Sequence, residues 1–262
     1  MSKLQVINVS KHFLDMKNGH QVSAIENISL SIEEGQFVCL VGPSGCGKST
    51  LLNILAGLDR PTDGQVVLNG QIVTETGPDR VMVFQENALF PWLKVIDNVE
   101  FGLKMAGVEK KRRFEISMRY LDLMQLSRFS NLYTYQLSGG MKQRVAIARA
   151  LVTDPEVLLM DEPFAALDSQ TRDLLLVELQ LIWAKTRKTI VFVTHNILES
   201  VCLGDKVVVF TSRPGKIKAE IAVDHRRPRL SEDTELQGYQ RRILEELKHE
   251  IISSRKSEDA TL

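Results

Sequence analysis

The sequence contains few cysteines, and their placement argues against a disulfide scaffold. Only 3 of its 262 residues are cysteine, an odd number without the paired spacing of a zinc site. Two of them, Cys39 and Cys202, lie within or beside apolar runs. This usage suits a reducing compartment, so we expect the chain to be exposed to the cytoplasm.

An excess of either charge is also missing. Lysine and arginine together number 33, as do aspartate and glutamate, so the formal net charge is zero. Proteins that hold nucleic acid or an anionic membrane surface usually carry a positive field, and this chain has none overall. We therefore expect no nucleic acid among its partners.

Long apolar runs are absent as well. No stretch approaches the roughly 20 residues that a helix needs to span a bilayer. The N-terminus does not show the charged, apolar and small-residue pattern of a signal peptide. Any role at a membrane is therefore expected to be peripheral.

What the sequence does contain is enough apolar material for a sizeable core, since 44% of its residues are hydrophobic. Short apolar runs alternate with helical patterns, which predicts an α/β fold built on a parallel sheet. Strands are expected at residues 4–9, 23–32, 37–41, 66–68, 81–84, 157–160, 189–193 and 207–210.

Strand signals disappear in the middle of the chain, where helical patterns cover residues 95–105, 111–124 and 139–152. A further amphipathic pattern covers residues 230–252. We therefore predict a single domain with three parts. Residues 1–85 and 156–225 form the core, 86–155 an inserted helical subdomain, and 226–262 a C-terminal helix and tail.

A glycine-rich loop follows the expected strand at 37–41 and precedes a helix that begins near Lys48. It fits the pattern G-x(4)-G-K-[S/T], in which backbone N–H groups cradle phosphate. Lys48 would meet the β- and γ-phosphates of ATP, and the Ser49 hydroxyl would ligate Mg²⁺. The candidate binding residues are Gly42, Pro43, Ser44, Gly45, Cys46, Gly47, Lys48, Ser49 and Thr50. Cys46 is interpreted as a small filler rather than a reactive thiol, although a helix N-terminus lowers the pKa of a nearby thiol.

Two acids, Asp161 and Glu162, end the expected strand at 157–160. Ligands of open parallel sheets bind at this end of the strands, and two adjacent carboxylates there favour a cation. Asp161 is the candidate Mg²⁺ ligand, and Glu162 the group that orients and polarises the attacking water. The alternative is an acidic turn that caps the segment ending at Asp168.

Two more polar residues follow strands. His195 comes after the strand at 189–193, so we predict that it contacts the transferring phosphate rather than packing in the core. Gln85 ends the strand at 81–84 and opens the helical segment. Its amide is a candidate ligand of Mg²⁺ or of the attacking water, and its backbone a candidate hinge.

The run Leu137-Ser-Gly-Gly-Met141, followed by Lys142-Gln-Arg-Val-Ala-Ile-Ala-Arg-Ala-Leu151, places Ser138 and two glycines at a second helix start. One nucleotide does not need two anion sites. The run resembles the signature of the ATP-binding cassette (ABC) family. With the loop, Gln85, the acidic pair and His195, the resemblance covers residues 4 to about 221 in family order.

The resemblance implies a P-loop NTPase with a RecA-like core sheet, an antiparallel β-subdomain and an inserted α-helical subdomain. It implies a transport-coupled ATPase that converts ATP and water to ADP and phosphate. Phe13 would stack on the adenine, unless it is a core aromatic. Ser138, Gly139 and Gly140 would act on the ATP of a second subunit. Asp168 would link the two sites, and His195 would be the γ-phosphate switch.

A free-standing cassette of this kind resembles those of bacterial importers. The resemblance implies a homodimer, or a heterodimer with a related cassette, on the cytoplasmic face of the inner membrane. Transmembrane permease subunits would be direct partners, and a solute-binding protein an indirect one. Trp92, in the run Ala88-Leu-Phe-Pro-Trp-Leu93, is either the apolar anchor for the permease or part of the core of the helical lobe.

Four short runs are similar to the nitrate/sulfonate/taurine subfamily of importer ATPases, which also serves bicarbonate. They are Leu89-Phe-Pro-Trp-Leu93, Gly77-Pro-Asp-Arg80, Leu137-Ser-Gly-Gly-Met141 and Ser212-Arg-Pro-Gly215.

Two other function classes stay open from the sequence. A soluble ABC ATPase that acts on ribosomes or DNA would resemble members with two cassettes or long coiled-coil insertions, and this chain shows neither. A P-loop kinase or a non-transport NTPase would leave the run from Leu137 to Met141 unexplained.

Overall fold

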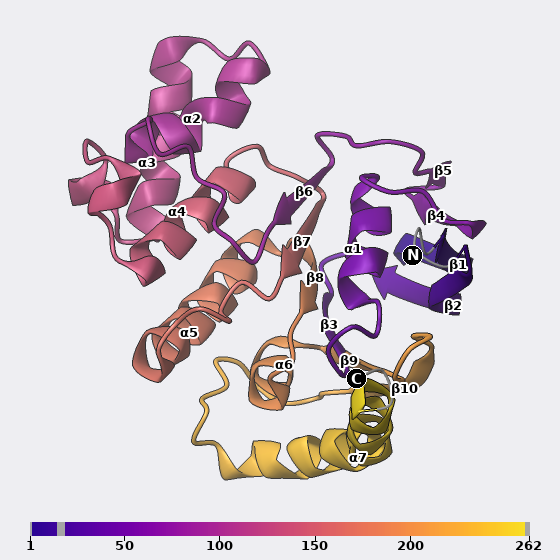
Figure 1. The fold of residues 1–262 in the computed structure, drawn as a ribbon. Coiled ribbons are helices and arrows are strands. Elements are labelled where there is room, and N and C mark those ends of the chain that lie inside the picture. The colour runs from indigo at the N-terminus through magenta and orange to yellow at the C-terminus, as the bar shows by residue number, and fades with distance from the viewer. Residues whose placement is uncertain (1, 15–18, 260–262) are drawn as a thin grey trace.

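The computed structural model describes residues 2–14 and 19–259 of the chain (Figure 1). Its helices and strands form two sheets, a helical lobe and a C-terminal helix. In Figure 1 the helical lobe lies on one side of the larger sheet and the smaller sheet on the other, with helix α1 next to the latter. The α/β fold predicted from the sequence is confirmed.

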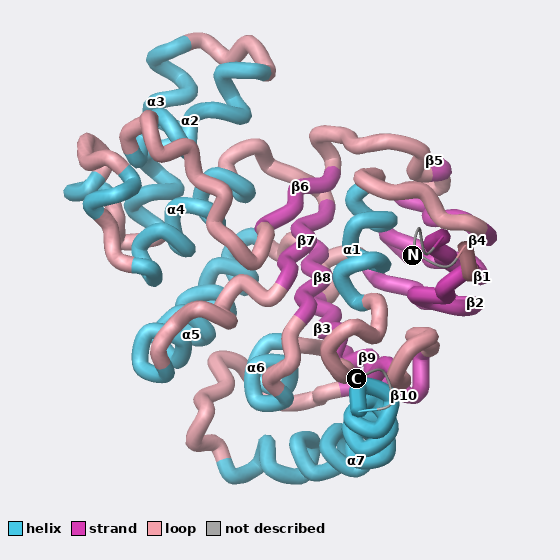
Figure 2. Tube along the Cα trace, in the orientation of Figure 1, coloured by secondary structure: helices cyan, strands magenta, loops and turns pink. Residues whose placement is uncertain are grey.

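The larger sheet carries the candidate site. Its strand order is β10-β9-β3-β8-β7-β6, and β9, β3, β8, β7 and β6 run parallel (Figure 2). β10 is antiparallel to β9 at one edge. Every residue of β3 and of β8 is buried, as strands covered on both faces should be. The strands are β3 (Phe37–Val41), β6 (Arg80–Val83), β7 (Val157–Asp161), β8 (Thr189–Val193), β9 (Lys206–Phe210) and β10 (Ile217–Ala222).

The smaller sheet is antiparallel, with the order β2-β1-β4-β5. It comprises β1 (Ser2–Leu14), β2 (Gln21–Glu33), β4 (Asp63–Leu68) and β5 (Gln71–Ile72). Helix α1 (Lys48–Ala56) contributes to one apolar core that joins this sheet to β3, β7 and β8. β1 is longer than the predicted strand at 4–9, because irregularities in its pairing with β2 let it continue to Leu14.

Three helices occupy the chain between β6 and β7: α2 (Val95–Met105), α3 (Lys110–Leu123) and α4 (Gly139–Leu151). All three were predicted from the helical patterns, whereas the division of the chain at residues 86 and 155 stays a prediction. The buried Asn98 side chain accepts a hydrogen bond from the Phe90 N–H and donates to the carbonyls of Phe90, Leu93 and Lys94. These bonds fix the segment that presents Trp92.

Helices α5 (Ser169–Thr186) and α6 (Ile197–Leu203) were not predicted, and the predicted helix at 230–252 had wrong boundaries. Helix α7 spans Gln237–Asp259 and follows a short 3₁₀ turn. It begins later than predicted because hydrogen bonds of Arg229 hold the preceding segment in a non-helical conformation. The buried Arg229 guanidinium donates to carbonyls of Val201, Gly204, Val223 and His225. Of the helices in the described ranges, none is long and apolar enough to cross a bilayer.

Candidate nucleotide site

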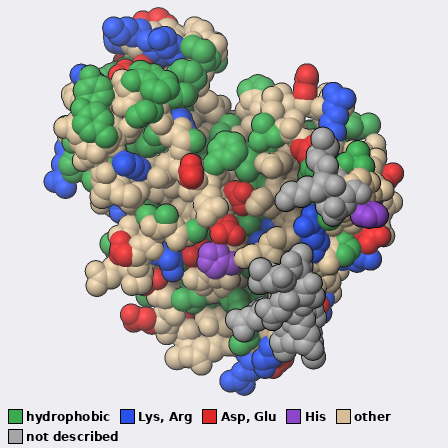
Figure 3. Space-filling model, viewed as in Figure 1, with side chains coloured by type: hydrophobic (Ala, Val, Ile, Leu, Met, Phe, Trp, Pro, Cys, Tyr) green, Lys and Arg blue, Asp and Glu red, His purple; other side chains and the backbone are tan. Residues whose placement is uncertain are grey.

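The carboxyl ends of three neighbouring parallel strands meet at one edge of the larger sheet. The glycine-rich loop follows β3, Asp161 and Glu162 lie at the end of β7, and His195 follows β8. The topology therefore brings together three segments that lie far apart in the sequence. In the space-filling view, acidic side chains and a histidine gather at the middle of the face shown (Figure 3).

The loop turns sharply into α1 at Gly47, whose φ of 95° lies in the left-handed region. A Cβ there would stand 2.4 Å from Ile25 Cγ2 and 2.8 Å from the Ala24 carbonyl oxygen, so only glycine fits. The next residue, Lys48, is buried, and its Nζ donates to the carbonyls of Gly42 and Pro43 at 2.8 Å each. A helix N-terminus and a buried ammonium thus point at the same small space, which favours a phosphate.

The same loop borders a cavity of about 350 Å³, a size that suits a nucleotide. The cavity is lined by Phe13, Ala24, Ser44, Gly45, Cys46, Gly47, Lys48, Ser49, Thr50, Glu162 and Arg213. Phe13 is 43% exposed, and Lys11 Nζ lies 5.1 Å from its ring centroid. Phe13 is therefore not a core aromatic, and its ring is available at the cavity.

Cys46 is fully buried within the loop. Burial raises the pKa of its thiol, and the nearby Lys48 ammonium opposes that shift without cancelling it. The thiol is thus protonated at neutral pH, in agreement with a filler role and against the lowered pKa that a helix N-terminus alone would give.

The Ser49 hydroxyl donates a hydrogen bond of 3.0 Å to Asp161 Oδ1 and so joins the loop to β7. Burial raises the pKa of Asp161, and the neighbouring Glu162 charge adds to the shift, while Ser49 and Lys48 oppose it. The carboxylate therefore lacks full compensation for its charge. A hydroxyl and a carboxylate at one point are hard oxygen donors, a set that fits Mg²⁺ held jointly with nucleotide phosphates. The described chain contains no cluster of three His, Cys, Asp or Glu side chains that would hold a metal by itself.

Glu162 has a left-handed backbone, with φ of 43°, which is uncommon outside glycine. Its N–H donates to the Val193 carbonyl at 3.0 Å, which holds the turn against β8. The turn brings Glu162 Oε2 to 3.0 Å from His195 Nδ1. The His195 side chain is 59% exposed, so the pair lies at the surface of the site. Strained backbone of this kind often occurs at functional residues.

A buried acid lies behind this pair and was missed by the sequence reasoning. The Thr194 hydroxyl donates to Glu199 Oε2 at 2.6 Å, and Arg172 Nε lies 3.5 Å from Glu199 Oε1. Burial raises the pKa of Glu199. The network connects the segment of His195 to the first turn of α5.

The run from Leu137 to Met141 forms the start of α4. Ser138 is its N-cap and accepts a hydrogen bond from the Met141 N–H at 3.3 Å. Ser138 and Gly139 are exposed, whereas Gly140 packs against Thr171 of α5. None of these residues belongs to the described lining of the nucleotide cavity.

Asp168 caps α5, the neighbouring helix, and accepts a 2.9 Å hydrogen bond from the Thr171 N–H. This bond lowers the pKa of its exposed carboxyl group. The structure thus gives Asp168 a capping role and leaves it at the surface. The starts of α4 and α5 are thus both exposed.

Two sequence candidates lie further from the cavity. Gln85 is exposed just beyond β6 and is not part of the cavity lining that the described residues form. Trp92 is 70% exposed, and its ring centroid lies 5.7 Å from that of Phe90. The alternative that Trp92 belongs to the core of the lobe is therefore wrong.

Arg213 lines the nucleotide cavity and was not among the predicted site residues. It lies in the loop between β9 and β10, within the run Ser212-Arg-Pro-Gly215. The only signal in the sequence was the resemblance of that run, which assigned no role to the side chain.

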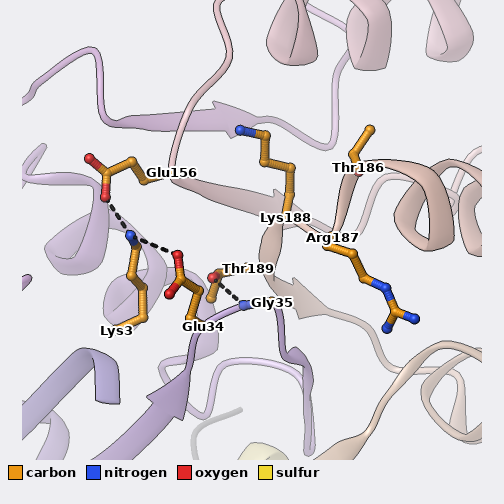
Figure 4. Close-up of a pocket in the computed structure, with 8 residues that line it drawn as sticks. All are labelled: Lys3, Glu34, Gly35, Glu156, Thr186, Arg187, Lys188 and Thr189. Carbon is orange, nitrogen blue, oxygen red and sulfur yellow. Dashed lines mark hydrogen bonds and ion pairs between the residues drawn. The ribbon is translucent and has the colours of Figure 1, made fainter. Parts of the chain in front are cut away.

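A larger depression of about 490 Å³ lies elsewhere on the molecule (Figure 4). It borders the amino ends of β3, β7 and β8, opposite to the ends that bear the loop and the acids. Lys3 Nζ lies 2.7 Å from Glu156 Oε2 and 3.5 Å from Glu34 Oε1. Lys188 pairs with Asp154, which is outside the lining, at 2.7 Å. Because these lysines and acids are already paired and the depression lies at the amino ends of the strands, it is a structural junction rather than a nucleotide site.

Comparison with known proteins bears on this geometry. The family model described as "ABC transporter" matches residues 25–165, more than half of the chain. The chain is 49% identical to the nitrate import ATP-binding protein NrtD of Synechocystis over 221 residues, which cover 84% of this chain and 82% of the relative. It is 48% identical to the taurine import ATP-binding protein TauB of Rhizobium johnstonii over 212 residues, 81% of each chain.

Among solved structures, the chain resembles the dimeric, post-hydrolysis state of the ATP-binding cassette MJ0796 bound to ADP and phosphate. The TM-score is 0.75 at 34% identity, and the match covers 85% of this chain and all of that one.

Proposed function

The chain belongs to the family of ABC transporter ATP-binding proteins and is an ATPase, and from this premise we propose that it drives an importer through a separate membrane permease. In this proposal, ATP binding closes a dimer of cassettes, closure moves the permease, and hydrolysis resets both.

The phosphate loop and Lys48 bind the β- and γ-phosphates in the cavity described above. Phe13 packs on the adenine. Ser49 and Asp161 would hold Mg²⁺. Gln85, outside the described cavity lining, would have to approach through the hinge predicted at its backbone to become a further ligand of the metal or of the attacking water. Bound Mg²⁺ supplies charge neutralisation for the phosphates.

Hydrolysis itself needs a positioned water. Glu162 accepts a hydrogen bond from that water and takes up its proton, while His195, 3.0 Å from Glu162, donates to an oxygen of the γ-phosphate. The products are ADP and phosphate. Most of the rate enhancement comes from positioning and charge stabilisation.

The observation that carries the proposal is the exposure of the signature. Ser138 and Gly139 lie at the start of α4 at the surface, outside the cavity that the loop lines. A second cassette in head-to-tail arrangement would place this helix start over the γ-phosphate of the first. Since one chain carries both halves, a homodimer completes two sites; a related cassette as partner is the second form.

The importer class rests on the relatives, which are named as nitrate and taurine import proteins. We propose that the solute belongs to the nitrate, sulfonate, taurine or bicarbonate class. The cassette would lie peripherally on the cytoplasmic face of the membrane, with a solute-binding protein acting on the permease from the other side. Trp92, exposed beside Phe90, is the proposed permease contact, and hydrophobic side chains gather over the helical lobe in Figure 3.

The test is co-purification of the tagged chain from detergent-solubilised membranes of its native cells. We expect a multi-helix membrane subunit in the wild-type sample, and its loss from the Trp92→Glu variant. Leu58→Glu is the matched control, since Leu58 is also exposed but follows α1, far from the lobe in sequence. Recovery of ribosomes without a membrane subunit would instead support the soluble ABC ATPase.

A further inference from the structure

The loop between β9 and β10 borders the nucleotide cavity through Arg213. Arg213 Nε donates to the Ser23 carbonyl at 3.3 Å, and the side chain as a whole is exposed. Ser23 pairs with His12 across the smaller sheet, next to the pairing of Phe13 with Val22. The guanidinium is thus held beside the strand pair that presents Phe13.

The same loop packs directly on the phosphate loop. A Cβ at Gly215 would stand 2.0 Å from the Cys46 carbonyl oxygen, so the two backbones are in close contact. The Gly215 N–H donates to the Ala24 carbonyl, and the Glu26 N–H donates to the Gly215 carbonyl, both at 2.9 Å. A displacement of this loop would therefore move the wall of the cavity.

Helix α7 holds the loop from its other side. Glu250 Oε2 accepts hydrogen bonds from the Ser212 N–H at 2.7 Å and from the Ser212 hydroxyl at 3.1 Å. Glu250 Oε1 accepts from Lys218 Nζ at 2.9 Å. Burial opposes ionisation of Glu250, but these bonds outweigh it and lower its pKa. A charged carboxylate of α7 is thus bound to the residue that precedes Arg213.

We propose that Arg213 binds the nucleotide and donates hydrogen bonds to oxygens of the phosphate nearest the ribose. In this proposal Glu250 of α7 is a positioning residue, which holds the loop so that the Arg213 side chain stays at the cavity. The proposal rests on the assignment of the cavity to the nucleotide. Arg213 shares the lining of one cavity with the two groups that would flank such a ligand, the ring of Phe13 and the phosphate loop. A guanidinium in that place suits phosphate oxygens. The C-terminal helix thereby acts on nucleotide affinity.

The first experiment measures binding of fluorescent ATP and ADP analogues to the full chain, together with ATP turnover. Arg213→Ala is expected to weaken both nucleotides by about 10-fold, the lower range for a charge-assisted hydrogen bond at an exposed side chain. The loss is equal for ATP and ADP because the contact lies on the ribose side of both. The KM for ATP rises together with the loss of affinity. Arg213→Lys keeps the charge and recovers part of the affinity.

The second experiment tests Glu250 by a double-mutant cycle. Glu250→Gln is expected to weaken ATP binding about three-fold in the wild-type background and to have no effect in the Arg213→Ala background. A merely structural role would give the same change in both. Lys216→Ala is the matched control: Lys216 is on the same loop, forms an exposed ion pair with Glu26 at 2.9 Å, and its loss should leave affinity unchanged.

Three results would overturn the proposal: unchanged affinity in Arg213→Ala, a loss confined to ATP, or equal effects of Glu250→Gln in both backgrounds. Lys48→Ala separates this failure from a wrong assignment of the site. If Lys48→Ala abolishes binding while Arg213→Ala does not change it, only the role of Arg213 is wrong. If neither changes it, the cavity itself is misassigned.

Discussion

The phosphate-loop half and the signature half of the molecule are built in opposite ways. Lys48, Asp161 and Glu162 are buried or half-buried at the sheet edge, where their charges face one another. Ser138 and Gly139 are uncharged and exposed at the first turn of a helix, and they lie outside the described lining of the nucleotide cavity. One half concentrates titratable groups at one point, whereas the other presents backbone N–H groups and the Ser138 hydroxyl at a helix start.

Under the proposed function, this difference separates the half that performs the chemistry from the half that binds the γ-phosphate of the ATP held by the partner subunit. A cluster of charges orients phosphate, metal and water, as catalysis requires. A helix start binds an anion through its backbone N–H groups, and in the proposed dimer that anion is supplied by the ATP of the partner subunit. Changes in the first half should therefore affect turnover, and changes in the second should affect assembly.

The largest effect is expected at Glu162. Glu162→Gln keeps the shape of the side chain but removes the proton acceptor, so turnover should fall by roughly 10²- to 10⁴-fold. ATP binding should remain, and a stable ATP-bound dimer should accumulate. Steady-state ATPase assays and size-exclusion chromatography with and without ATP measure the two effects. Turnover near that of the wild type would remove Glu162 from its assigned role.

The second effect is expected at Gly139, first on assembly of the dimer and, through assembly, on turnover. A Cβ there meets only Leu167 Cδ2 at 3.8 Å, so Gly139→Asp is accommodated in the monomer. Its carboxylate suits a helix N-terminus but repels the γ-phosphate of a partner. We expect normal thermal stability and monomeric ATP binding, with loss of the ATP-driven dimer. A dimer that still forms with ATP would contradict the assignment.

Gly140→Ala is the matched comparison in the same helix turn. Its Cβ would stand 2.5 Å from Thr171 Cγ2, which forces α4 and α5 apart or turns Thr171 away. This variant should lower the melting temperature, whereas Gly139→Asp should not. Thermal unfolding followed by circular dichroism distinguishes the two.

The smallest effect is on stability, at Asp161. Its pKa is raised in the folded chain, chiefly by burial, so the ionised carboxylate costs stability at neutral pH. That cost disappears as pH falls through the raised pKa, because the folded chain then takes up the proton more readily. Without nucleotide and metal, Asp161→Asn should have a slightly higher melting temperature than the wild type at pH 7. The difference between the two melting temperatures should become smaller toward pH 4. A difference in melting temperature that does not change with pH would show that the charge of Asp161 does not destabilise the folded chain.

The sequence predicted those elements whose physical signal is local. All eight expected strands are present. Five of them, β3, β6, β7, β8 and β9, are parallel strands, which read as short, continuous apolar runs. Helix α5 was missed, since its apolar residues are not confined to one side: Leu174 and Leu181 are exposed, while their neighbours Leu175 and Ile182 are buried. Strand β10 is an edge strand with a single buried residue, so its sequence Ile217-Lys-Ala-Glu-Ile-Ala222 lacks a strong apolar signal.

The candidate site divides in the same way. Lys48, Ser49, Asp161 and Glu162 were found because each belongs to a compact motif next to a strand. Arg213 was missed because its place at the cavity depends on the path of a loop and on a contact with α7, which no local pattern encodes.

The three cysteines have a practical consequence. Cys39, Cys46 and Cys202 are all buried, and burial raises each thiol pKa, that of Cys202 to about 12. The native chain should therefore be nearly silent toward maleimide reagents. A single cysteine introduced at an exposed position on the signature side would be the dominant labelling site, and a spectroscopic probe there would follow opening and closing in real time without removal of any natural thiol.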